Sequence, residues 1–273
     1  MAVHPIVIRR PTLPSTSTPG ELIIFLHGRL EADEHESNIS IPDPSELYID
    51  FLSNLYDKLP PNSQILMPAY HEHYKDWKRE PRDLTLGPVS SAIGQAIHNH
   101  VEEMHEPIKA TVISFSMGAA VLLKLLANDP ILSRKKSCVE IHVQRLILIE
   151  PVWRCWLPFA VSEANKRIGD PTKGATAISD VPALAIAGTG DDEVRCDSGC
   201  MGQRNMDCVR RSLKPFLPSV RVAEIEGGNH FGGVCSGLDN IAVDGLGAGV
   251  ALPGLQAEII GHIAKFMSVE VDQ

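Results

Sequence analysis

The sequence predicts an α/β fold in which a mostly parallel central sheet is covered by helices on both faces. Short apolar runs rich in β-branched residues alternate along the chain with longer segments of helical periodicity. The 273 residues fit one domain, and an apolar content of 44% suffices for a sheet buried on both sides. We therefore expect a single domain over residues 1–273.

The expected elements follow from these two periodicities. Strands are predicted at residues 6–9, in the apolar run that stops at the His27-Gly28 pair, and at residues 64–67, 111–114, 145–149, 181–190 and 220–225. Pro68 is expected to end the third of these strands, and the last is expected at an edge of the sheet. Helices are predicted at residues 44–58, 90–104, 119–127 and 255–267.

The segment 110–126 is the most informative, because it places Ser116 on a tight turn between a buried strand and a helix. Only residues 115–118 separate the two elements, so the serine must adopt a strained backbone conformation that raises its hydroxyl above the sheet edge. The same turn directs the N–H of Met117 from the start of the helix, where it favours a developing negative charge. The alternative is a serine that caps an ordinary core helix.

The segment from Ser114 to Gly118 resembles the G-x-S-x-G nucleophile elbow of the α/β-hydrolase family, with serine in place of the first glycine. In that family an acid and a histidine follow the serine in chain order. The segment from Gly188 to Val194 is similar to the family's G-x-x-D-x-x-V segment, which favours Asp191 over Asp192 as the acid. Polar turns after strands also contain aspartate for local reasons.

The histidine that the resemblance implies is His230, which follows the last predicted strand in Gly227-Gly228-Asn229-His230-Phe231. This chemistry needs a base that titrates near neutral pH and is oriented by a carboxylate. A second donor to the oxyanion is expected after the His27-Gly28 pair, which is similar to the family's H-G turn, and it would be the N–H of Arg29. We interpret His27 as a structural brace rather than a base.

Two segments are expected to shape the substrate pocket. Residues 150–180 stand where the family inserts a short cap, and they contain Trp153 and Trp156, which either line an apolar cleft or anchor the cap to the body. Tyr70 begins the second candidate wall, residues 70–77, whose H-x-H pattern lacks a nearby third ligand and is interpreted as a solvated or substrate-facing loop. Phe231 is the fourth candidate for substrate binding. The glycine-rich run at 232–254 has no assigned role.

Composition excludes several function classes. A net charge of -9 and a pI near 5.6 argue against a nucleic acid or an anionic membrane as partner. No apolar run is long enough for a signal peptide or a membrane span, so a cytoplasmic location is expected. The six cysteines are then expected to be mostly free thiols. The C-x3-C-x7-C spacing at Cys196, Cys200 and Cys208 leaves a local disulfide or a metal site as alternatives.

The resemblance implies a serine hydrolase that cleaves a small or medium ester or thioester. Its catalytic residues would be Ser116, His230 and Asp191, with the N–H groups of Met117 and Arg29 as the oxyanion hole. No cofactor and no metal is expected. Two alternatives stay open: a lyase, cyclase or carbon-carbon hydrolase of specialised metabolism that uses the same site, and a ligand-binding module with a vestigial triad. The oligomeric state is not predicted.

Overall fold

The structure is a computed structural model in which the strands and most of the predicted helices are described. The described residues are 3–8, 20–28, 44–70, 82–102, 108–119, 121–122, 125, 141–151, 181–189, 210, 213–214, 217–228, 233–235 and 253–269.

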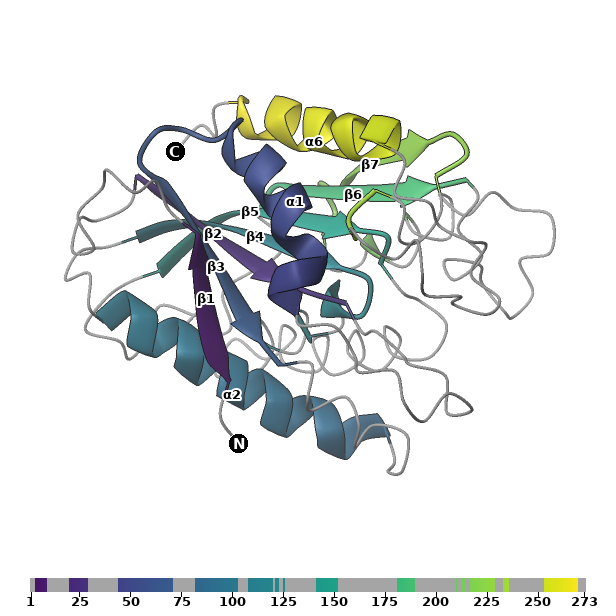
Figure 1. Cartoon of the computed structure of the whole chain (residues 1–273). Coiled ribbons are helices and arrows are strands. Elements are labelled where there is room, and N and C mark those ends of the chain that lie inside the picture. Colours follow the sequence, from purple (N-terminus) through teal and green to yellow (C-terminus); the bar gives the residue numbers. More distant parts are fainter. Residues whose placement is uncertain are drawn as a thin grey trace, which may run out of the picture.

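A seven-stranded sheet forms the centre of the molecule (Figure 1). The strand order is β1-β3-β2-β4-β5-β6-β7, and every neighbouring pair is parallel except the antiparallel pair of β1 and β3. The strands are β1 (His4–Ile8), β2 (Glu21–Leu26), β3 (Ser63–Ala69), β4 (Ile108–Phe115), β5 (Ile141–Ile149), β6 (Ala183–Gly188) and β7 (Arg221–Ile225). Because β2 and β4 to β7 are parallel, their carboxyl ends share one edge, hereafter the carboxyl edge.

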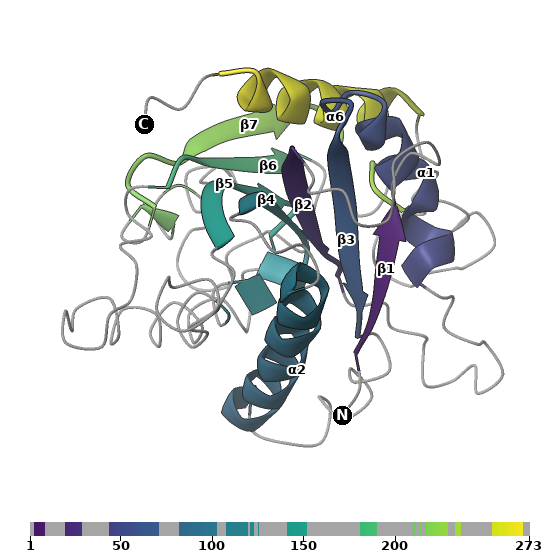
Figure 2. The ribbon, with the colours of Figure 1, turned by 90° about the vertical axis from the view of Figure 1, so that its left-hand side faces the viewer.

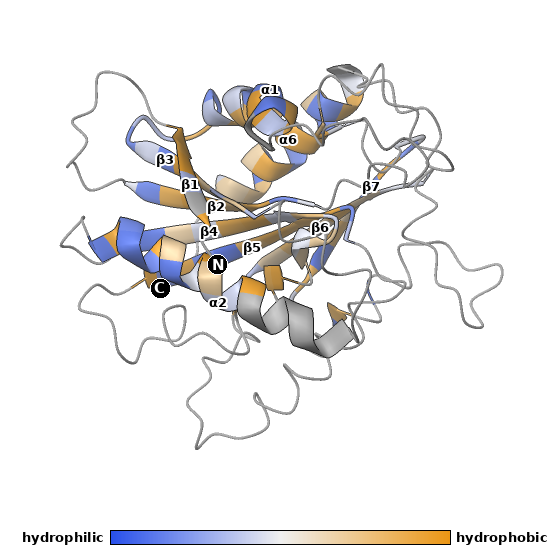
Figure 3. Cartoon of the chain, turned by 60° about the horizontal axis from the view of Figure 1, so that its bottom comes forward, coloured by the Kyte–Doolittle hydropathy of each residue, from blue (hydrophilic) through white to orange (hydrophobic). Residues whose placement is uncertain are grey.

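Helices cover both faces of this sheet (Figures 1 and 2). Helices α1 (Pro44–Tyr56) and α6 (Pro253–Met267) pack on one face, where Phe51 and Ile263 join a fully buried apolar cluster. Helix α2 (Arg82–Glu102) and the helical residues after Ser116 pack on the other face through a second cluster. Figure 3 shows the central strands as mainly hydrophobic. The predicted mostly parallel, doubly covered sheet is confirmed.

The structure corrects several predicted boundaries, among them the end of β3 and the start of α2. Pro68 does not end β3, because it lies within the strand and pairs with Pro5 of the edge strand β1. The ladder between β3 and β2 reaches only Leu66, so the missing N–H of Pro68 falls beyond that pairing. Helix α2 begins at Arg82, eight residues before the predicted start at residue 90. The edge position of β7 is confirmed.

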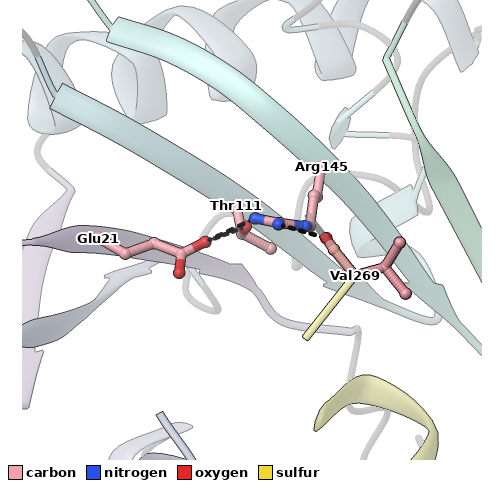
Figure 4. Close-up of polar contacts among 4 residues, drawn as sticks. All are labelled: Glu21, Thr111, Arg145 and Val269. Atoms are coloured by element: carbon pink, nitrogen blue, oxygen red, sulfur yellow. Dashed lines mark hydrogen bonds and ion pairs between the residues drawn. The ribbon is translucent and has the colours of Figure 1, made fainter. Parts of the chain in front are cut away.

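A partly buried polar cluster closes the opposite, amino edge of the sheet (Figure 4). Glu21 accepts a hydrogen bond of 2.6 Å from the Thr111 hydroxyl and forms an ion pair of 3.5 Å with Arg145. Arg145 also donates to the backbone oxygen of Val269, at 3.0 Å, just after α6. These contacts join β2, β4, β5 and the end of α6, so we assign this cluster a structural role.

Within the described residues, no helix has both the length and the apolar character required to cross a bilayer.

Candidate active site

Ser116 stands at the carboxyl edge, directly after β4, in the strained conformation that the sequence predicts. Its φ is 51° and its side chain is buried, with 3% of the residue exposed. The backbone N–H of Ser116 donates to the backbone oxygen of Ile149 at 2.9 Å. The backbone oxygen of Ser116 accepts from the N–H of Ala119 at 3.0 Å. A left-handed conformation costs a residue other than glycine about 1–3 kcal/mol, and such strain concentrates at functional positions. The surrounding contacts therefore hold Ser116 in this turn.

The neighbouring serine has a different environment. Ser114 lies inside β4, is fully buried, and its hydroxyl donates to the oxygen of Ile147 at 3.4 Å. A hydroxyl within a central strand cannot rise above the sheet edge. The geometry therefore distinguishes Ser116 from Ser114 as the candidate nucleophile.

Two glycines bring the end of β2 against this turn. A methyl group added at Gly28 would lie 2.8 Å from the Ser116 Cβ, closer than real Cβ atoms approach. A methyl group at Gly118 would collide with the backbone oxygen of Leu26 and would lie 3.0 Å from that of His27. Since both positions exclude a Cβ, the backbone after β2 can lie directly beside Ser116. This is the position from which a backbone N–H can face the nucleophile.

We expect Gly118→Ala to destabilise the fold, because the obstructing atoms at Gly118 are backbone atoms that cannot rotate away. Overpacking of this kind costs roughly 1–3 kcal/mol, and larger losses occur. Gly261→Ala is the matched control, since nothing lies within 4 Å of its added methyl group in α6. Alanine there should stabilise the helix by about 0.5–1 kcal/mol. Thermal melts of both variants measure the difference, and equal melting temperatures would contradict the close packing.

His27 braces the turn after β2 rather than serving as a base. It is fully buried, and its Nε2 accepts from the N–H of Tyr70 at 3.2 Å. The proton is therefore on Nδ1, which donates to the oxygen of Gly28 at 2.8 Å. With both ring nitrogens bonded to backbone groups, the imidazole fixes the carbonyl of Gly28. The structural interpretation of His27 is confirmed.

Tyr70, which the sequence predicts to bind substrate, is a core residue in contact with His27. Only 1% of Tyr70 is exposed, its ring stacks on the imidazole at a centroid distance of 3.8 Å, and its hydroxyl donates to the oxygen of His27 at 2.6 Å. Through these contacts Tyr70 stabilises the His27-Gly28 turn. A contact between Tyr70 and a substrate stays a prediction.

We expect Tyr70→Phe to lower kcat by about three- to tenfold, the equivalent of roughly 0.7–1.4 kcal/mol. The change removes the hydrogen bond to the backbone oxygen of His27 and should make the His27-Gly28 turn beside Ser116 less rigid. Tyr56→Phe is the control, because it removes a hydroxyl that donates to the oxygen of Ser63 at 3.2 Å, in the core at the start of β3. Melting temperatures and ester turnover are measured for both variants. If the two substitutions changed kcat alike, Tyr70 would have no specific link to the site.

Sequence reasoning missed Glu150, which the structure places beside Ser116 at the carboxyl edge. It follows β5 immediately, is 2% exposed, and has a φ of 44°. The ladder pairs Phe115 with Ile149, so Ser116 and Glu150 follow paired positions on adjacent strands. One signal was present in the sequence, since Glu150 is a charged residue directly after a buried strand of a parallel sheet.

Several predicted site residues lie outside the described residues: Arg29, Asp191, Asp192, His230, Phe231, Trp153 and Trp156. Met117 is described, is 5% exposed, and its oxygen accepts from the N–H of Val121 at 3.3 Å. It therefore begins the helical turn after Ser116, as predicted. The strands that lead to the predicted acid and histidine, β6 and β7, both end at the carboxyl edge.

Cys235 does not compete with Ser116 as a nucleophile. It is a free, buried thiol whose pKa is raised to about 12 by burial, which a hydrogen bond with Tyr48 only partly offsets. A thiol with this pKa carries almost no thiolate at neutral pH. The other five cysteines lie outside the described residues, as does the C-x3-C-x7-C segment. In the part of the chain that is described, no group of three or more potential ligands could hold a metal ion.

Comparisons with known proteins identify the fold. No family model and no curated protein matches the sequence. Among solved structures, acyl-protein thioesterase 2 of Zea mays is similar over 97% of this chain and 99% of its own, with 16% identity and a TM-score of 0.52. A protein of Agrobacterium vitis S4 is similar over 97% and 98% of the two chains, with 12% identity and a TM-score of 0.50. The chain therefore has the α/β-hydrolase fold.

Proposed function

We propose that this chain is a serine hydrolase that cleaves a small or medium acyl ester or thioester. The observation that carries the proposal is the strained, buried Ser116 at the end of β4, with the glycine-lined end of β2 on one side and Glu150 on the other. Such a turn favours a nucleophile, since neither a core serine nor a simple helix cap requires a left-handed φ. The likeness in fold to a maize acyl-protein thioesterase supports the inclusion of thioesters.

In the proposed mechanism, the Ser116 hydroxyl adds to the acyl carbon while His230 takes the hydroxyl proton. Asp191 orients His230, and the N–H groups of Met117 and Arg29 bind the oxyanion. The tetrahedral intermediate expels the alcohol or thiol, which leaves with the proton from His230. Water then adds to the acyl-enzyme by the same route and releases the carboxylic acid together with free Ser116. No cofactor takes part.

The substrate class is tested by hydrolysis of p-nitrophenyl esters and matching S-acyl thioesters of increasing chain length. Ser116→Ala is the blank, and Ser114→Ala is the matched control. We expect hydrolysis that depends on Ser116, with kcat/KM varying along the acyl series. The absence of Ser116-dependent hydrolysis across both series would overturn the proposal.

A further inference from the structure

We infer that Glu150 is a positioning residue that sets where the loops carrying Asp191 and His230 leave the sheet. This inference rests on the proposed function, because it concerns the triad of that site. Glu150 is proposed here as a positioning residue and not as a catalytic one. It acts through the backbone of β6.

Glu150 holds the end of β6 with both its backbone and its side chain. Its N–H donates to the oxygen of Ile186 at 2.8 Å, and its carboxylate oxygen Oε1 accepts from the N–H of Gly188 at 2.8 Å. A buried backbone N–H that loses its acceptor carries the full desolvation cost of that group, so the contact of Oε1 with the Gly188 N–H has a substantial effect. The left-handed φ of 44° lets the chain turn out of the sheet at this residue. The strain at Glu150 is therefore balanced by a specific contact with the neighbouring strand.

Gly188, which Glu150 binds, and its neighbour Thr189 also contact the end of β7. A methyl group at Gly188 would collide with the backbone of Gly228, so the two glycines lie in direct contact. The Thr189 N–H donates to the oxygen of Ile225 at 3.0 Å, and its hydroxyl accepts from the N–H of Gly227 at 2.8 Å. The turns after β6 and β7 are thus fixed to one another, and Glu150 fixes both to β5.

These contacts connect Glu150 with the predicted catalytic residues. Asp191 follows Gly188 by three residues, and His230 follows Gly228 by two. On the other side of Glu150, the Ser116 N–H donates to the oxygen of Ile149 at 2.9 Å. A buried carboxylate therefore stands between the nucleophile turn and the two turns from which the acid and the base emerge. Displacement by about 1 Å in such an arrangement can cost about a hundredfold in rate.

The test compares Glu150→Gln with Glu150→Met. Glutamine keeps an acceptor oxygen for the Gly188 N–H, whereas methionine has similar length but no such acceptor. We expect Glu150→Met to lower kcat for a p-nitrophenyl ester at least tenfold with KM within about twofold of wild type. Glu150→Gln should recover activity to within about threefold. Glu21→Met is the matched control, because it removes a partly buried carboxyl group at the amino edge and should lower the melting temperature without changing kcat.

A second measurement tests whether Glu150 holds the end of β6, and it does not depend on enzymatic activity. Hydrogen exchange of the Gly188 N–H, followed by NMR in the full chain, should be about fivefold or more faster in Glu150→Met than in wild type, and near wild type in Glu150→Gln. If Glu150→Met had a lower melting temperature, as expected for Glu21→Met, but the kcat of wild type, the role of Glu150 would be structural only. If wild type showed no Ser116-dependent hydrolysis, the proposed function would fail. Unchanged Gly188 exchange in Glu150→Met would separately refute the positioning role.

Discussion

Replacement of Ser116 by alanine is expected to lower ester hydrolysis by at least about a thousandfold while the protein stays folded. Alanine removes the oxygen that we propose attacks the acyl carbon, and the residual rate should then reflect oxyanion binding and proximity alone. The Ser116 hydroxyl lies at the carboxyl edge rather than inside β4, so its loss should change the melting temperature little. The measurement is kcat/KM for one p-nitrophenyl ester together with a thermal melt.

Ser114→Ala is the control for this prediction. Its hydroxyl contacts the oxygen of Ile147 within the sheet at a long 3.4 Å, so alanine should cost about 1 kcal/mol of stability or less and leave hydrolysis near wild type. A larger loss of turnover in Ser114→Ala than in Ser116→Ala would show that the wrong serine has been assigned.

Asp191→Asn is expected to cost about 10^2- to 10^4-fold in kcat. The amide cannot stabilise the imidazolium that forms on His230, and it favours the wrong tautomer of the neutral ring. Asp192→Asn, which removes the adjacent carboxylate, should act mildly. Both variants are compared with wild type on the same ester, with thermal melts to confirm folding. A reversed order of the two effects would move the acid to Asp192.

The sequence was sufficient to predict the sheet because its strands are apolar on both faces. Runs such as residues 22–26 and 145–149 are almost continuously apolar, which is typical of strands in a parallel sheet covered on both sides. The turn at Ser116 was also predictable, since the four residues 115–118 between a strand and a helix leave few conformations. The boundary at Pro68 was not, because it depends on which neighbouring strand needs the missing N–H.

The contacts that complete the candidate site are long-range and were missed for that reason. Tyr70 and His27 are 43 residues apart, so nothing local reveals that the tyrosine holds the backbone of the histidine. Glu150 binds the N–H of Gly188, 38 residues away, whereas a glutamate after a strand is ordinarily solvated. Periodicity and spacing describe single elements, and these two contacts depend on how the elements meet at one edge of the sheet.

The nucleophile is tested most directly by labelling the full chain with a fluorophosphonate probe, followed by intact-protein mass spectrometry and peptide mapping. We expect one adduct per chain, located on Ser116, and no adduct on Ser116→Ala or on heat-denatured wild type. Cys235 should stay unmodified, because burial holds its pKa near 12. An adduct on a different residue, or a folded wild-type protein that takes no label, would contradict the assignment of Ser116 as an activated nucleophile.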